Sequence, residues 1–364
     1  MPGSHFSSTR MLQAQRVKIN NVKNKPALVS SVGKRRNLFR LINTRVIKKV
    51  KKIQQQNNNN NNNNNNILGK WDKLLDIDNP VGTGADDEFG VMVAISNNGQ
   101  TVAVIAQDYI NTNIGSQTGR LYIFELNGAG TDYTVSYQWS PSLSSNRIGF
   151  DNRENLIDIS DDGTRIILGE NNNNANEAKK MSGKVHVFEK ASGSWSLTKT
   201  FEGDNASQRQ YFCAISGDGS TIVTGFDSNS FAGHLRVYSY DGTNWTQKGS
   251  DITNNNATNN QKFGKSLDIN HDGSRVAGGA TGQSPDLFVA VYEYINNSWT
   301  QNGSNIAYTL NNGEGHGRRI RLNGLGNRIA ISQDNYSEPG YGSNNPGNQN
   351  EGRIVIYDYD GTSW

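Results

Sequence analysis

From residue 71 onward, hydrophobic and polar residues alternate in short runs separated by turn-forming residues. Alternation with a period of two indicates β-strands, and an Asx-Gly pair between two such runs indicates a hairpin turn with positive φ at both central residues. One such phrase occurs five times, at intervals of 53 to 64 residues. Its copies begin at Ile95, Ile159, Ile215, Ile269 and Leu322, and their turns contain Gly99, Gly163, Gly219, Gly273 and Gly326.

A second apolar run follows each hairpin and ends in Phe or Tyr; these runs are residues 119–124, 183–188, 233–238, 287–292 and 352–357. In four units a tryptophan lies seven residues after that aromatic residue: Trp195, Trp245, Trp299 and Trp364. In the first unit Tyr133 or Trp139 takes this place. Each unit therefore predicts four short strands: one after the tryptophan, two around the Asx-Gly turn, and one that ends in the aromatic residue.

Repeated sets of four antiparallel strands are typical of propeller blades, because one blade cannot bury both of its faces alone. The sequence predicts an all-β fold, a β-propeller of about five four-stranded blades over residues 71–364, with the five glycines and four tryptophans as structural repeat anchors. We expect residues 71–78 to lie antiparallel to residues 354–359 and to close the ring. The alternative is a chain truncated from a longer array of six to eight units.

The units resemble FG-GAP-like and WD-like propeller repeats, which are common in large DNA viruses, protists and marine bacteria. The residues that carry the resemblance are Phe89-Gly90, residues 263–266 leading to Gly279-Ala280, and the ending at residues 238–249. The resemblance implies a scaffold. It implies no metal, because no unit has the Asp-x-Asp-x-Asp-Gly loop of the calcium-binding relatives, and the Phe-Gly pair is replaced in three units.

Composition agrees with many strands and turns. Hydrophobic residues make up 34% of the 364 residues and Gly supplies 39, and the chain is also rich in Asn. Asn and Gly are poor helix formers, so the composition argues against a thick helical core. No apolar run is long enough to cross a membrane or to act as a secretory signal. The chain is therefore expected not to be classically secreted but to be intracellular or in a virion, with the nucleus as a further location.

Charge divides the chain into two parts. Residues 1–70 contain 15 Lys or Arg and no Asp or Glu, although the whole chain carries a net charge of only +3. We predict a basic arm at residues 1–52, mostly disordered, with an amphipathic helix near 35–53, and a Gln/Asn-rich linker at 53–70 that includes ten consecutive Asn. The basic residues of the helix are Arg35, Arg36, Arg40, Arg45, Lys48, Lys49, Lys51 and Lys52.

A basic amphipathic helix suits nucleic acid, an anionic membrane surface or an acidic protein partner. Nuclear localisation signals and organelle transit peptides have a similar composition, and a solvated tail without a partner is the remaining alternative.

Motifs for catalysis are lacking. Gly264-Lys265-Ser266 resembles the end of a phosphate loop, but Asn259 stands where the loop needs glycine. The histidines have no metal-ligand spacing, and Cys213 is the only cysteine. Four polar residues lie close together before the fifth hairpin: Glu314, His316, Arg318 and Arg319. We interpret them as the polar start of a strand rather than as a binding or catalytic site. We therefore predict no catalytic residue, no metal, no cofactor and no enzymatic activity.

The sequence thus favours a non-enzymatic propeller scaffold that binds a protein or a surface, with a virion structural component as one setting by analogy. A glycan-binding propeller is the alternative, with Tyr109, Tyr336 and Tyr341 as candidate contacts. A hydrolase that uses a carboxylate pair in the central channel is the third. Oligomeric state and partner identity are left open.

Overall fold

The computed structural model of the chain describes residues 76–80, 87–144, 146–149, 156–172, 182–204, 210–226, 232–255, 257, 261–281, 286–309, 317–333 and 352–364. The chain divides into residues 1–42 and residues 43–364, and all described residues belong to the second unit. The predicted basic arm, its helix, its basic residues and the linker therefore lie outside the described residues. The described part is all-β, and it contains no helix that could cross a membrane.

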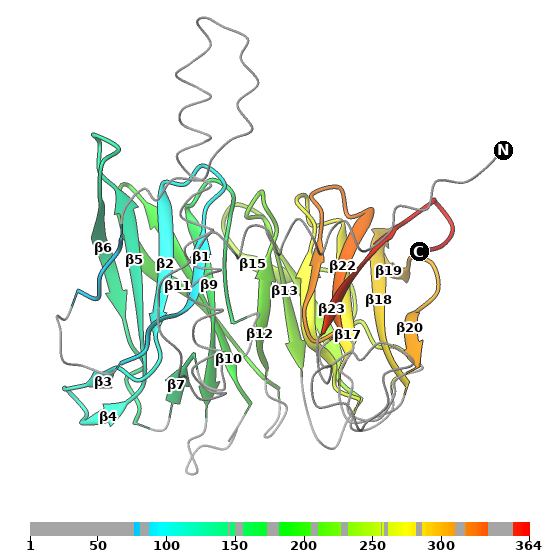
Figure 1. Ribbon diagram of the computed structural model, residues 1–364, viewed down its shortest axis with the longest axis horizontal. Helices are drawn as coiled ribbons and strands as arrows, with labels where there is room; N and C mark the ends of the chain where they lie inside the picture. The colour runs from blue at the N-terminus through cyan, green and yellow to red at the C-terminus, as the bar shows by residue number, and fades with distance from the viewer. Residues whose placement is uncertain are drawn as a thin grey trace, which may run out of the picture. The chain divides into compact units, whose positions relative to one another are not determined.

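The strands form five main antiparallel sheets in chain order (Figure 1). The first has the order β1-β2-β5-β6, with β1 at Phe89–Ile95, β2 at Thr101–Ala106, β5 at Arg120–Leu126 and β6 at Tyr133–Trp139. A small hairpin of β3 (Ile110–Asn111) and β4 (Ser116–Gln117) lies between β2 and β5.

The second sheet has the order β11-β10-β9-β7, and β8 also pairs with β9. Its strands are β7 (Asn146–Ile148), β8 (Ile157–Ile159), β9 (Arg165–Asn172), β10 (Lys184–Ala191) and β11 (Ser194–Glu202). The third has the order β12-β13-β14-β15, with bounds Gln210–Ile215, Thr221–Phe226, His234–Tyr240 and Trp245–Gln247.

The fourth sheet has the order β16-β17-β18-β19, and β20 also pairs with β18. Its strands are β16 (Phe263–Ile269), β17 (Arg275–Ala280), β18 (Asp286–Ile295), β19 (Ser298–Gln301) and β20 (Ile306–Thr309). The fifth sheet has three described strands in the order β21-β22-β23, with bounds Ile320–Leu322, Arg328–Gln333 and Arg353–Asp358.

The first four sheets contain the predicted set of strands: two around the turn, one that runs through the aromatic residue, and one at or after the tryptophan. In the first sheet Tyr133 pairs with Leu126, as Trp195 pairs with Lys190 and Trp245 with Tyr240. The structure therefore assigns the tryptophan position of the first unit to Tyr133 rather than Trp139.

The hairpin turns differ from the predicted type. Gly99, Gly163, Gly219, Gly273 and Gly326 have φ between 67° and 72°, but the residue before each of them does not have positive φ. The Asx side chain explains the difference: Asp162 Oδ1 accepts hydrogen bonds from the Ser160 hydroxyl at 2.6 Å and from the Thr164 N–H at 2.9 Å. These bonds hold a longer loop that needs the left-handed conformation only at glycine.

Hydrogen bonds between turns join neighbouring sheets along one end. The N–H groups of Asn97, Asp161, Asp218 and His271 donate to the carbonyl oxygens of Asp161, Gly217, His271 and Gly324, at 2.8–3.1 Å. Each junction between consecutive sheets also has its own cluster of buried apolar side chains. The same contacts therefore recur at all four junctions.

The predicted closing strand is not found in the described residues. Residues 76–80 form no strand, and Ile77 packs against the buried aromatic cluster of the first sheet, around Tyr122 and Phe124. Within the described part of the chain, β23 pairs with β22 alone. Ile77 thus packs against the first sheet instead of pairing with residues 354–359. Residues 71–75 lie outside the described residues.

Candidate functional site

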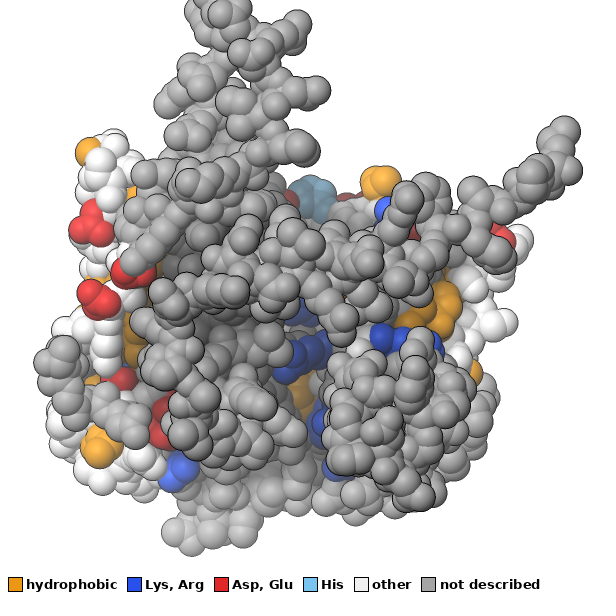
Figure 2. Space-filling view, in the orientation of Figure 1, with side chains coloured by type: hydrophobic (Ala, Val, Ile, Leu, Met, Phe, Trp, Pro, Cys, Tyr) orange, Lys and Arg blue, Asp and Glu red, His pale blue; other side chains and the backbone are white. Residues whose placement is uncertain are grey.

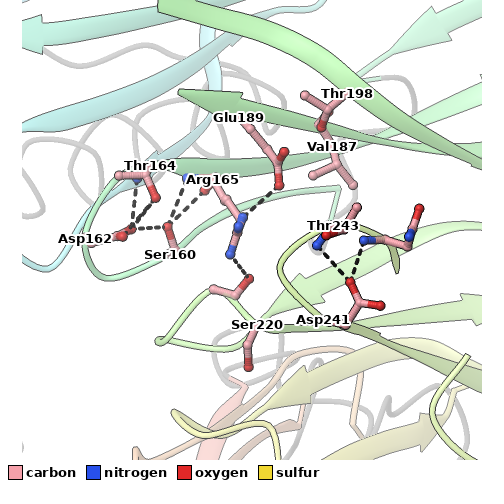
Figure 3. A network of polar contacts seen from close by, with 12 residues as sticks. Ser160, Asp162, Thr164, Arg165, Val187, Glu189, Thr198, Ser220, Asp241 and Thr243 are labelled. Atoms are coloured by element: carbon pink, nitrogen blue, oxygen red, sulfur yellow. Dashed lines mark hydrogen bonds and ion pairs between the residues drawn. The ribbon is translucent and has the colours of Figure 1, made fainter. Parts of the chain in front are cut away.

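The turn end of the sheets is occupied by contacts between the repeats. Arg165 donates from Nε to Glu189 Oε1 at 2.8 Å and from a guanidinium nitrogen to the Gly219 carbonyl at 3.0 Å (Figure 3). Its guanidinium also lies over the Tyr240 ring, 4.3 Å from the centroid. The Gly163, Gly273 and Gly326 carbonyls accept equivalent bonds from Thr101, Lys248 and Arg275. The carbonyl groups of four anchor glycines thus accept hydrogen bonds from side chains of the preceding repeat.

Three of the four anchor tryptophans also donate a hydrogen bond to the preceding repeat. The indole N–H of Trp195 donates to Glu125 Oε1 at 3.1 Å, that of Trp299 to the Lys248 carbonyl at 2.7 Å, and that of Trp364 to the Asn302 carbonyl at 2.8 Å. Among the described residues the buried indole N–H of Trp245 has no hydrogen-bond partner, but its ring packs against Phe201 of the second sheet. These residues join neighbouring repeats at this end.

Ionisable groups gather at the opposite end of the second and third sheets. Arg236 forms ion pairs with Asp251 and Asp204, both at 2.7 Å, and the hydrogen bonds that it donates to Asp251 raise the pKa of Arg236. Beside them, His234 stacks on Phe226, and burial lowers the pKa of this histidine. Figure 2 shows Lys and Arg side chains near the middle of the face in view.

In the second sheet a buried carboxylate contacts a buried histidine. Glu170 Oε2 lies 2.9 Å from His186 Nε2, and its Oε1 accepts a bond of 2.6 Å from the Asn146 amide. The other ring nitrogen of His186 lies 2.9 Å from the exposed Thr200 hydroxyl. The sequence analysis assigned His186 no role; this hydroxyl–imidazole–carboxylate chain depends on pairing between β9, β10 and β11.

Two further carboxylates lie on the innermost strands. Asp158 on β8 accepts the Ile215 N–H at 3.0 Å, and Asp268 on β16 accepts the Leu322 N–H at 2.6 Å. Each therefore bonds the unpaired edge of the next sheet's first strand. Burial raises the pKa of both carboxyls, that of Asp268 to about 6, while Arg321 opposes the shift from 3.7 Å away from Asp268. Both carboxylates accept hydrogen bonds from backbone amides, unlike the substrate-facing pair that the hydrolase alternative requires.

A cleft of about 580 Å³ lies beside the fourth sheet and is lined by hydrogen-bonding groups without charge. We call it the amide cleft. Its lining residues are Thr253, Asn254, Asn255, Tyr292, Gln301, Gly303, Ser304 and Asn305.

Hydrogen bonds organise one wall of the amide cleft. The Asn254 amide donates to the Tyr292 hydroxyl at 2.8 Å and to Asn305 Oδ1 at 3.1 Å, and the Gln301 amide donates to Asn305 Oδ1 at 2.9 Å. Burial raises the pKa of Tyr292 to about 12, so its hydroxyl stays neutral. Within the described part of the chain, the exposed side chains of Asn255 and Ser304 make no hydrogen bond.

The same sequence pattern gives a different site in the third sheet. There Gln247 donates to Asp251 Oδ1 at 2.9 Å, as Gln301 does to Asn305, but Asp251 is neutralised by Arg236. The repeated Trp-Thr-Gln-x-Gly-Ser-Asx-Ile pattern at residues 245–252 and 299–306 was the available signal. It was interpreted only as a repeat ending, because the contact with Asn254 is not visible in sequence.

The remaining sequence candidates are dispersed. Tyr109 lies under the Arg120 guanidinium at 3.6 Å, whereas Tyr336, Tyr341, Glu314 and His316 are outside the described residues. Among the described residues no group of three or more His, Cys, Asp or Glu is placed to hold a metal ion. Cys213 is buried, and burial raises the pKa of its thiol well above the usual value.

No family model matches the chain, and no curated protein matches it significantly. The predicted FG-GAP-like resemblance therefore has no support from these comparisons. Among solved structures, the periplasmic gluconolactonase of Pseudomonas aeruginosa is similar over 74% of this chain and 72% of its own, with 14% identity and a TM-score of 0.44.

TolB of Acinetobacter baumannii is similar over 66% of this chain and 50% of its own, with 10% identity and a TM-score of 0.35. Sqt1 of Saccharomyces cerevisiae is similar over 67% of this chain and 55% of its own, with 12% identity and a TM-score of 0.39. The chain thus spans about half the length of these two proteins. The gluconolactonase and TolB are propeller-like, and at these values the likeness assigns no activity to the chain.

Proposed function

We propose that the chain is a non-enzymatic β-propeller scaffold of about five blades that binds a partner through the amide cleft. The amide cleft supports this proposal because its hydrogen-bonding side chains line an open concavity. Other polar groups are engaged within the protein: Asp158 and Asp268 bond backbone amides, and Glu170 bonds Asn146. These carboxylates are bonded within the protein, whereas a hydrolase would need a carboxylate free to contact substrate.

The second candidate function is binding of a neutral glycan in the amide cleft. Amide and hydroxyl groups both donate and accept hydrogen bonds, which suits the paired hydroxyls of a sugar. The described lining residues include no Lys, Arg, Asp or Glu, so none of them selects a charged ligand. Tyr292 contributes its hydroxyl rather than an open ring face, because its side chain is buried.

A glycan array probed with the full chain tests both candidates. Glycan binding predicts a signal that falls at least tenfold in the Asn255→Ala and Ser304→Ala variants but not in Asn244→Ala, an exposed Asn outside the amide cleft. A partner protein that loses affinity in the same two variants, with no array signal, favours the scaffold. Hydrolysis of a glycan that Asp268→Asn abolishes would contradict the non-enzymatic proposal.

We further propose that the basic arm binds nucleic acid or another anionic surface, in an intracellular setting. Binding that neutralises six phosphates predicts a slope of about −5 in a plot of log affinity against log salt, from about −0.9 per phosphate on duplex DNA. Replacing Lys48, Lys49, Lys51 and Lys52 by Gln should flatten that slope. Binding to anionic vesicles alone would favour the membrane surface, and salt-independent binding would refute the proposal.

A further inference from the structure

The fifth sheet exposes an apolar face that every earlier sheet buries. In each third strand, the residues one and three positions before the aromatic residue point toward the following sheet. These pairs are Leu121 and Ile123, Val185 and Val187, Leu235 and Val237, and Val289 and Val291, each at most 1% exposed. In β23 the equivalent residues are Ile354 and Ile356, which are 72% and 63% exposed.

The strand register establishes that these positions are equivalent. Ile356 pairs with Ala330, as Val291 pairs with Ala277 and Val237 with Val223. At the junction of the fourth and fifth sheets, Val289 and Val291 pack against Ile320, Ile329 and Ile331. Ile354 and Ile356 therefore form a face, the tail face, equivalent to the faces that pack against a sheet with the same three apolar positions.

The first sheet carries those positions on its opposite side. Val93, Val102 and Val104 correspond to Ile320, Ile329 and Ile331, since Val93 pairs with Val104 as Ile320 pairs with Ile331. Val102 and Val104 are buried, but all seven residues of β1 are only half-buried. Among the counterparts of Val93, Cys213, Leu267 and Ile320 are at most 1% exposed, whereas Ile157 of the second sheet is half-buried as Val93 is. We name Val93 and Ile95 the head face.

We propose that the tail face of one copy of the chain docks on the head face of a second copy, so that copies associate head to tail. The contact between the two faces would reproduce the contact made at the four internal junctions. At each junction the third strand of one sheet packs against a sheet that has apolar residues at the positions of Val93 and Ile95. A second copy supplies that sheet without breaking the hydrogen bonds that join the turns within one chain, and it would displace Ile77 from the cluster that contains Val93 and Ile95. The contact is heterologous, because two different faces meet.

Sedimentation of the full chain at rising concentration tests the association. The wild-type chain should form dimers and larger species in 0.5 M salt, since an apolar contact is not screened as contacts of the basic arm are. Ile356→Asp should raise the dissociation constant more than about 100-fold, because it places a charge in the contact. Leu325→Asp is the matched control: Leu325 is 74% exposed but lies in the β21–β22 turn, and this variant should associate normally.

Complementation distinguishes head-to-tail docking from pairing of two β23 edges. Ile356→Asp keeps its head face and Val93→Asp keeps its tail face, so each alone should be monomeric and an equal mixture should form a dimer that grows no further. Circular dichroism would verify that Val93→Asp is folded, and Val93→Lys offers a second variant at that position. Dimers of Val93→Asp alone, or no dimer in the mixture, would overturn the proposal.

Thiol labelling of an Ile356→Cys variant separates a second copy from closure within one chain. Cys213 is buried, so the new thiol would be the fast-reacting one. Labelling that slows as protein concentration rises supports docking between copies. Labelling that is slow at every concentration indicates closure by the chain's own first sheet, and labelling that is fast at every concentration indicates an unoccupied face; either result overturns the proposal.

Discussion

Replacing Asp268 by Asn should stabilise the protein above pH 6 and leave its stability unchanged below pH 4. Asp268 is buried on β16, and its Oδ2 accepts the Leu322 N–H at 2.6 Å. An Asn side chain has nearly the same shape and retains an oxygen for that hydrogen bond. The substitution therefore removes the ionisation of this group and little else.

The magnitude follows from the pKa shift. Burial raises the pKa of Asp268 from 3.8 to about 6, so the native state binds this proton more tightly than the unfolded state. Below pH 4 both states are protonated and the group costs nothing. As the pH rises from 4 to 6, the unfolded chain ionises first and the free energy of unfolding falls; above pH 6 the loss is complete. Two pKa units correspond to about 3 kcal/mol.

Urea unfolding of the wild-type chain and Asp268→Asn at pH 4, 5, 6, 7 and 8 measures the effect. Comparing the two chains at each pH cancels the titration of groups they share. Part of the gain is offset by the lost attraction to Arg321, which is small because that side chain is largely exposed. The expected difference in unfolding free energy is near zero at pH 4 and up to about 3 kcal/mol at pH 7.

Asp358→Asn is the control. Asp358 is exposed, and its hydrogen bond with Arg328 lowers its pKa. Its stabilising contribution is present above pH 4 and is lost as the pH falls, so this substitution should act with the opposite sign. A free-energy difference for Asp268→Asn that is the same at every pH would refute the assignment of a raised pKa to Asp268.

Gly225→Ala should destabilise the protein by about 1–3 kcal/mol, because the added Cβ would collide with the Gly264 carbonyl oxygen; Gly128→Ala, with open space around it, should be neutral in the same urea titration. Limited proteolysis followed by mass spectrometry should cut first within residues 1–70 and leave a core that begins near Trp71; an intact arm beside a nicked core would contradict the two-part organisation. EDTA should leave the melting temperature unchanged, since we predict no metal site, and a fall of several degrees would contradict this.

Local features of the fold were open to prediction from the sequence. Short apolar runs locate β2 and β5, and the Asx-Gly pairs locate the hairpins, because both depend on residues that are neighbours in the chain. The predicted turn type was wrong, and the reason is also local. The Asp162 carboxylate accepts hydrogen bonds from Ser160 and Thr164, and in this loop only Gly163 needs positive φ.

Contacts between repeats depend on tertiary structure. The amide cleft brings together Asn254 and Asn305, which are 51 residues apart, and the pKa of Asp268 depends on burial and on the Leu322 N–H of the next sheet. Periodicity predicts which residues of a strand are apolar and buried, but it does not predict which sheet packs against them. Ile356 has the same local pattern as Val291, yet one is exposed and the other buried, because exposure is decided by whether another sheet packs against that face.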